Sequence, residues 1–151
     1  MKNILYATDF SKNAEKAFHF ALKIAEKHQA DLIMLHVFDV LPVFGQPYIM
    51  GPDEMTRQSR KSWEGQLQEF FKQFKSDIQP TYIAIENTSV VKGILSVIDK
   101  YKPQLVVTGT KGDSTVKELL LGGTTKALVK KSPIPVLAVP DYAVLKDYDK
   151  I

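Results

Sequence analysis

Short, continuous apolar runs alternate along the chain with longer segments in which apolar residues recur every three or four positions. Continuous runs of this kind are typical of strands buried on both faces of a parallel sheet, and the periodic segments are typical of amphipathic helices. The expected strands cover residues 4–7, 32–38, 81–85, 105–107 and 134–139. The pattern therefore predicts five strands joined by helices.

The helical segments have recognisable ends. The first follows Ser11, which can cap a helix, and it places apolar residues from Ala14 to Ala25 on one face. A second helix is expected over residues 53–75. A third is expected between Ser89, another candidate cap, and Pro103. A short last helix is expected over residues 124–131.

Alternating strands and helices predict an α/β fold, with a single open, five-stranded parallel sheet of the Rossmann-like kind and right-handed crossovers. Ligands of such sheets bind at the carboxyl ends of the strands, near the point at which the strand order reverses. Pro135 favours an edge position, or a strand start, for the last strand. His36 interrupts the second strand, and a lone histidine in such a run is more often a hydrogen-bonded structural residue than a ligand or a base.

Residues 39–52 break the regular pattern, because three prolines and two glycines fall within them. This insertion is nevertheless apolar, with Phe44, Tyr48 and Met50 among its side chains. It either folds over the edge of the domain or covers a ligand or partner surface. Residues 141–151 form a C-terminal tail of mixed apolar and charged residues, which either docks on a dimer or is mobile.

Composition narrows the classes of function. The 151 residues are expected to form one domain, residues 1–140, followed by the tail. The chain has no cysteine, which excludes disulfides, thiolate metal ligands and a cysteine nucleophile. Its 20 basic and 17 acidic residues are interspersed, so nucleic-acid binding is not expected. No segment is apolar for long enough to be a signal peptide or a membrane span, so we expect a cytoplasmic protein without a membrane partner.

The strongest chemical signal follows the fourth strand. This strand stops at Gly109, and Thr110, Lys111 and Gly112 come next, while residues 122–124 precede the last helix. Free backbone N–H groups, a hydroxyl, an ammonium and a helix N-terminus are the groups that bind phosphate. Turn formation and helix capping explain the same glycines without a ligand. Neither of the two best-known phosphate-binding glycine motifs occurs in the chain.

The spacing Gly109-x2-Gly112-x9-Gly122 resembles the nucleotide-binding motif of the universal stress protein family, which is written Gly-x2-Gly-x9-Gly-(Ser/Thr). Residues 4–11, 35–37 and 132–139 resemble further segments of that family and occur in the same order. The resemblance covers residues 2–140, nearly the whole chain.

The resemblance implies the strand order 3-2-1-4-5 of adenine nucleotide alpha hydrolase-like folds, in which the loops after the first and fourth strands are neighbours. It also implies that ATP binds there with Mg²⁺, which Asp9 would help to hold, and that a homodimer forms through the fifth strand. Asp9 is equally suited to cap the following helix. The implied nucleotide-binding residues are Ala7, Thr8, Asp9, Val37, Phe38, Gly109, Thr110, Lys111, Gly112, Gly122, Gly123 and Thr124.

Two positions depart from the family pattern. Gly123 stands where the motif has Ser or Thr, and the missing hydroxyl removes a hydrogen bond worth about 1.5–3 kcal/mol if it reached a charged group. Thr88 and Ser89 stand where relatives usually have Gly and Pro. Phosphoryl transfer usually needs a cationic clamp, but the two arginines, Arg57 and Arg60, lie outside the motif loops.

Three functions remain open. The retained glycines favour an ATP-binding regulatory module of the stress response with little or no hydrolysis. Gly123 and the apolar insertion favour a dimeric interaction protein with a vestigial nucleotide site and an unknown protein partner. A slow ATPase is the third alternative, and measurable turnover would be its evidence.

Overall fold

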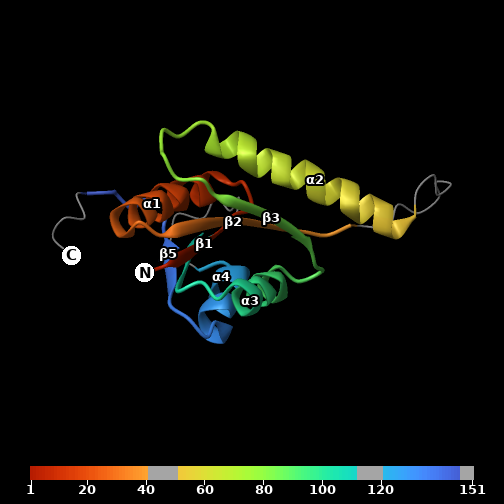
Figure 1. The fold of residues 1–151 in the computed structure, drawn as a ribbon. Helices are drawn as coiled ribbons and strands as arrows, with labels where there is room; N and C mark the ends of the chain where they lie inside the picture. Colours follow the sequence, from red (N-terminus) through yellow and green to blue (C-terminus); the bar gives the residue numbers. More distant parts are fainter. Residues whose placement is uncertain (41–50, 112–120, 147–151) are drawn as a thin grey trace.

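The computed structural model describes residues 1–40, 51–111 and 121–146, and Figure 1 shows how its elements are arranged. Strands and helices alternate, as the apolar pattern predicts. The elements in chain order are β1 (Asn3–Ala7), α1 (Lys12–His28), β2 (Asp31–Phe38), α2 (Pro52–Phe71), β3 (Thr81–Glu86), α3 (Val90–Tyr101), β4 (Leu105–Gly109), α4 (Gly123–Lys131) and β5 (Val136–Val139).

The strands form a parallel sheet in the order β3-β2-β1-β4-β5, which confirms the predicted strand order. β1 lies at the centre, where Tyr6 is in register with Met34 of β2 and Val107 of β4. From β1 the chain progresses outward to β3, and it then returns to the centre and progresses outward from β4 to β5. The order therefore reverses between β1 and β4, and the loops after these two strands are neighbours.

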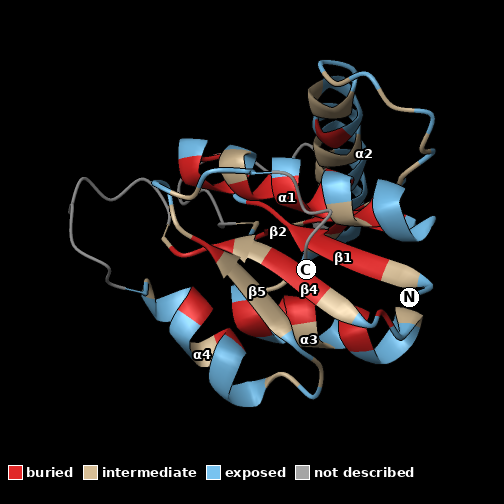
Figure 2. Cartoon of the chain, turned by 90° about the vertical axis from the view of Figure 1, so that its left-hand side faces the viewer, coloured by how far each residue is buried: buried red, intermediate tan, exposed pale blue. Residues whose placement is uncertain are grey.

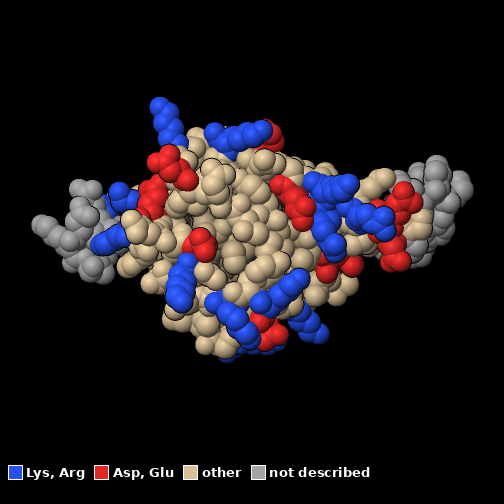
Figure 3. All heavy atoms as spheres, viewed as in Figure 1, with Lys and Arg blue, Asp and Glu red and all other residues tan. Residues whose placement is uncertain are grey.

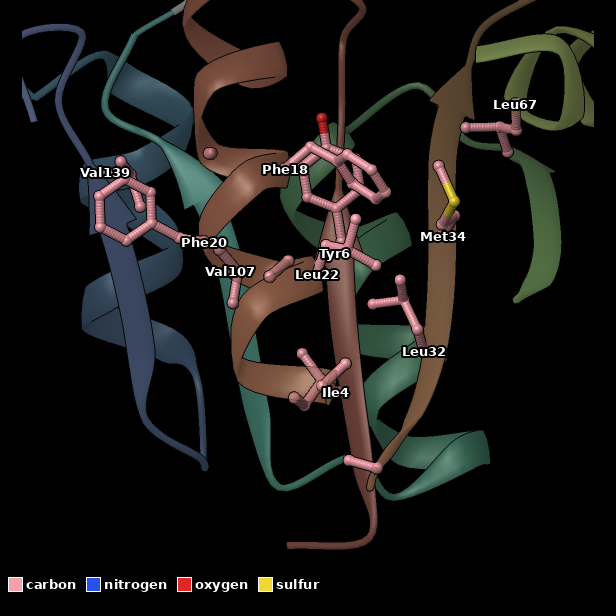
Figure 4. Packing of buried hydrophobic residues seen from close by; sticks show 14 residues of the cluster. Ile4, Tyr6, Phe18, Phe20, Leu22, Leu32, Met34, Leu67, Val107 and Val139 are labelled. Atoms are coloured by element: carbon pink, nitrogen blue, oxygen red, sulfur yellow. The ribbon is translucent and has the colours of Figure 1, made fainter. Parts of the chain in front are cut away.

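Helices cover both faces of the sheet, with α1 and α2 on one side and α3 and α4 on the other (Figure 1). Side chains alternate along each strand, so Tyr6 packs in the cluster under α1 and α2, whereas Leu5 packs in the cluster over α3. Figure 4 shows the rings of Tyr6 and Phe18 together, with their centroids 4.9 Å apart. Phe74 meets Phe18 edge-on at 4.6 Å, so the partly buried phenylalanines at helical spacing pack against the core.

The helix ends follow from side-chain and backbone hydrogen bonds. The hydroxyl of Ser11 accepts the backbone N–H of Ala14, and that of Ser89 accepts the backbone N–H of Lys92, so both predicted caps are confirmed. α2 ends at Phe71, short of the predicted residue 75. There the N–H of Phe74 donates to the carbonyl of Phe71, three residues earlier. This tighter 3₁₀ spacing ends the α-helix.

β5 begins at Val136, two residues later than predicted. Pro135 has no N–H to donate to the sheet, and the hydroxyl of Ser132 donates to the carbonyl of Ile134 in a tight turn before it. The strand forms an edge of the sheet, as Pro135 favours, and Figure 2 shows it half-buried beside the buried β4. Most of the apolar insertion, residues 41–50, lies outside the described residues, and Pro52 already begins α2.

The surface shows the mixed charge that the sequence predicts. On the face shown in Figure 3, basic and acidic side chains are interspersed, with neither sign gathered into a patch. None of the helices in the described ranges carries an apolar stretch long enough to cross a bilayer.

Gly93 lies inside α3 and packs against the side chain of Val37 on β2. A Cβ at residue 93 would lie 2.7 Å from Cγ1 and 2.8 Å from Cγ2 of Val37. Alanine normally stabilises a helix interior relative to glycine by about 0.5–1 kcal/mol. Here we expect Gly93→Ala to lower the free energy of unfolding, measured by urea denaturation, by about 1–3 kcal/mol, the usual effect of overpacking.

Gly65 of α2 provides the matched control, because a Cβ there would meet no atom within 4 Å. Gly65→Ala should therefore stabilise the protein. Val37→Ala should relieve the overlap, so the double variant with Gly93→Ala should lose less stability than the sum of the two single variants. Simple additivity of the two losses would contradict the steric explanation.

Candidate functional site

A pocket of about 250 Å³ opens at the carboxyl ends of β1 and β4, where the strand order reverses. Strand ends form its floor, and the first turns of three helices form its walls. The residues that line it are Ala7, Thr8, Asp9, Ala14, Leu35, Val37, Val90, Ile94, Thr108, Gly109, Lys111, Gly122, Gly123, Thr124 and Thr125. The fold thus brings the Asp9 loop and the glycine loop into one site.

Nine of the predicted binding residues line this pocket, two do not, and one lies outside the described residues. Phe38 follows Val37 in β2, and alternate residues of a strand face opposite sides of the sheet. Thr110 is buried, and its carbonyl accepts the backbone N–H of Gly122 at 2.6 Å. Gly112 lies outside the described residues.

Sequence reasoning missed the apolar wall that α3 contributes. Val90 and Ile94 lie one helical turn apart at the start of α3, and both face the pocket together with Leu35 of β2. Val90 is a large apolar residue that remains 43% exposed. Its spacing from Ile94 indicates a shared helix face, but spacing alone does not indicate that this face lines the pocket.

Gly109 is a glycine because α1 approaches it closely. A Cβ there would overlap the side-chain oxygen of Asn13, which is itself buried in the first turn of α1. The Asn13 carboxamide accepts the backbone N–H of Lys111 at 3.0 Å and donates to the carbonyl of Val139 at 3.3 Å. The first glycine of the motif therefore allows α1, β4 and β5 to be joined through one side chain.

The start of α4 is fixed against the same strand end. The hydroxyl of Thr125 donates to the carbonyl of Gly109 at 2.9 Å, while Thr124 stays exposed at the pocket. Gly123 is the first residue of α4, and a Cβ there would meet no atom within 4 Å. The helix N-terminus, whose first N–H groups have no acceptor within the helix and which carries a partial positive charge, thus borders the pocket.

Asp9 performs the local role that the sequence indicated. Its carboxylate accepts the backbone N–H of Ser11 at 2.9 Å through one oxygen, just before α1. The next residue, Phe10, has a φ of 63°, in the left-handed region. This conformation costs a non-glycine residue about 1–2 kcal/mol, so the surrounding contacts must hold the loop in place.

Asp9 and Lys111 are the ionisable side chains among the described residues that line the pocket. The ammonium of Lys111 lies 3.4 Å from the carboxylate of Asp141, which follows β5. The Lys111 side chain is only 12% exposed and the Asp141 side chain 55% exposed. Water therefore screens the pair from one side, and its contribution to stability is small.

His36 lies on the face of the sheet opposite the pocket. Its Nδ1 is 2.9 Å from the carbonyl oxygen of Thr8, so Nδ1 carries the proton of this hydrogen bond. The imidazole also contacts the rings of Phe10 and Trp63, with centroids 4.9 Å and 4.3 Å away. It is a hydrogen-bonded structural residue, as the sequence indicated.

A divalent cation has a limited choice of ligands here. Among the residues that the structure describes, no three His, Asp or Glu side chains gather to hold a metal ion. Asp9 leaves one carboxylate oxygen without a bond to Ser11, and Mg²⁺ in nucleotide sites is commonly held by one or two carboxylates together with phosphate oxygens. The site therefore fits a metal that arrives with a phosphate ligand.

Sequence comparison assigns the chain to a known family. The profile of the universal stress protein family matches residues 1–140. The chain belongs to the universal stress protein family. A universal stress protein of Methanocaldococcus jannaschii is 31% identical over 143 residues, which cover 91% of this chain and 81% of that protein.

Two solved structures show the same fold with a nucleotide. A universal stress protein in complex with cAMP superposes with a TM-score of 0.62 at 21% identity, covering 91% of this chain and 96% of that one. The universal stress protein from Archaeoglobus fulgidus in complex with dAMP gives 0.60 at 16% identity, covering 92% and 97%. At these identities the likeness establishes the fold alone.

Burial lowers the pKa of His36 below its ordinary value of 6.5, and the bond to Thr8 and the charge of Asp9 oppose this shift only in part. The unfolded chain therefore takes up this proton first as the pH falls. The stabilisation that neutral His36 provides is complete above about pH 6.5 and decreases below it. We expect the free energy of unfolding, measured in urea, to fall more between pH 7.5 and 5.5 in the wild type than in His36→Asn. Equal decreases would contradict the shift.

Proposed function

We propose that this universal stress protein binds an adenine nucleotide, with ATP and Mg²⁺ as the physiological ligand, and acts as a nucleotide-dependent regulatory module. The observation that carries the proposal is the composition of the pocket. An apolar floor of strand ends, Asp9 and the helix N-terminus at Gly123 line it together, at the place where the strand order reverses. The dAMP and cAMP complexes of two relatives support an adenine nucleotide as the ligand.

The two ends of the pocket suit the two ends of a nucleotide. The floor at Leu35 and Val37 and the wall at Val90 are apolar, as a purine ring requires. Lys111 and the N-terminal N–H groups of α4 suit the phosphates. In this arrangement Asp9 would hold the ribose hydroxyls or the nucleotide-bound Mg²⁺.

A regulatory role suits this site better than rapid hydrolysis. Phosphoryl transfer relies on cationic groups that neutralise the transferring phosphate. Lys111 is the cationic side chain among the described pocket-lining residues, and Arg57 and Arg60 lie on α2, across the sheet. Bound nucleotide then acts as a signal that a protein partner or the dimer senses in the cytoplasm.

Gly123 allows binding to be tested without disturbing the fold, because its position has room for a side chain. Gly123→Ser restores the hydroxyl of the family motif and should tighten Mg-ATP binding by about tenfold or more. Gly123→Asp places a negative charge beside the phosphates and should weaken binding by about tenfold or more. Isothermal titration of nucleotide-free protein measures both effects.

The unfolding temperature of Gly123→Asp shows whether a loss of binding reflects a loss of folding. A carboxylate in the first turn of a helix stabilises that helix, so Gly123→Asp should unfold at the same temperature as the wild type or above it. Gly109 is less suitable for this purpose, because any side chain there overlaps Asn13. Absence of binding in the wild type and in Gly123→Ser would overturn the proposal and favour a vestigial site.

The edge strand β5 is the surface through which we propose that a homodimer forms. Within the part of the chain that the structure describes, no further strand lies beside its outer edge, and edges of this kind recruit another strand. Tyr142 and Val144, which follow the strand, are 61% and 69% exposed apolar side chains that a partner would cover. Sedimentation equilibrium at micromolar concentration should give twice the mass of the chain, and the mass of a single chain would contradict the proposal.

A further inference from the structure

Three aromatic rings from three separate elements meet behind the pocket. Phe10 comes from the loop after β1, His36 from β2 and Trp63 from α2. The ring centroids lie 4.9 Å apart for Phe10 and His36, 4.3 Å for His36 and Trp63, and 5.6 Å for Phe10 and Trp63. These rings lie on the α2 side of the sheet, whereas Leu35 and Val37 of β2 face the pocket from the α3 side.

Thr8 connects this cluster to the pocket. It lines the pocket, and three of its polar groups form hydrogen bonds. Its N–H donates to the carbonyl of Leu35, and its hydroxyl accepts the N–H of Phe10, both at 2.9 Å. Its carbonyl accepts a hydrogen bond from Nδ1 of His36, also at 2.9 Å. The first two bonds fix the end of β1 and the turn. The bond from His36 fixes the plane of the peptide that joins Thr8 to Asp9.

The orientation of this peptide decides where the Asp9 N–H points. The peptide is trans, so its N–H points opposite to its carbonyl. His36 holds the carbonyl toward the α2 side, and the N–H is therefore directed away from His36, toward the side of the sheet on which Thr8 and Asp9 line the pocket. A rotation of this peptide would exchange the donor for an acceptor there.

The conformation of Phe10 adds strain to the same loop, at the next peptide unit. Its φ of 63° is strained for an aromatic residue, and a change in this loop would relieve the strain. The contacts of Phe10 with the rings of His36 and Trp63 hold it in place. The hydrogen bond to Thr8 and the aromatic cluster thus act on two consecutive peptide units, Thr8–Asp9 and Asp9–Phe10.

We propose that His36 is a positioning residue of the nucleotide site, which acts through the sheet by holding the Thr8–Asp9 peptide so that the Asp9 N–H donates into the pocket. This inference rests on the proposed function, because the group that accepts this N–H would be an oxygen or nitrogen atom of the bound nucleotide. His36 touches no ligand itself, and Phe10 and Trp63 hold its ring in place.

The chain allows a test with two variants of nearly equal size. His36→Asn retains a side-chain N–H close to the place of Nδ1, whereas His36→Leu has no donor. We expect His36→Leu to bind Mg-ATP roughly three- to tenfold more weakly in isothermal titration, the effect of one lost hydrogen bond, and His36→Asn to recover most of the affinity. His36→Phe keeps a ring without the donor and should behave like His36→Leu.

A second measurement needs no nucleotide. The amides of Phe10 and Ser11 donate to side chains within the loop, so their hydrogen exchange reports loop opening. Their exchange should accelerate in His36→Leu and stay close to the wild-type rate in His36→Asn. His19→Leu is the control, because His19 is an exposed residue of α1 whose ring contacts Phe74 and none of the three rings of the cluster. Its affinity and loop exchange should match those of the wild type.

The outcomes separate the two proposals. Loss of affinity and loop protection in His36→Leu and His36→Phe, with recovery in His36→Asn, supports the positioning role. Equal affinity in the wild type and His36→Leu, or equal loss in His36→Asn and His36→Leu, overturns it. Absence of ATP binding by the wild type overturns the proposed function instead, and it would be seen in every protein of the series.

Discussion

The carboxamide of Asn13 is the contact on which the geometry of the pocket depends. It joins the start of α1 to the backbone of Lys111 after β4 and to the end of β5, and these segments lie 98 and 126 residues from it in the chain. A buried amide without such bonds would be costly, so each partner fixes the others. The side chain fits only because Gly109 has no Cβ. The first glycine of the motif is therefore a packing requirement before it is a ligand-binding group.

Two glycines at the pocket differ in how much space surrounds them. Gly109 has no space for a side chain, whereas Gly123 has open space beside it. The motif of the universal stress protein family has glycine at the position of Gly109 and Ser or Thr at the position of Gly123, and the space at each position in this chain suits both. Gly123 is thus a departure that changes the chemistry of the pocket without changing its shape.

The sheet could be predicted from the chain because its strands are apolar on both faces, and Ser11 and Ser89 marked two helix starts correctly. Strand order needed the family resemblance, since periodicity contains no information on which strands are neighbours. Asn13 could not be predicted as a site residue, because one asparagine in the first turn of an amphipathic helix looks like a solvent-exposed position. Val90 was missed for a related reason: whether a helix face lines a pocket depends on tertiary packing, which residue spacing within one helix does not reveal.

Trp63 gives the protein a property that extends beyond its packing. It is the single tryptophan of the chain, and its ring lies 4.3 Å from the imidazole of His36, whose other side is bonded to Thr8. All indole fluorescence of the protein therefore originates from a ring that contacts Phe10, in the loop that borders the pocket. The molecule carries a native optical reporter of that loop, which responds to the contacts of the ring without any attached dye.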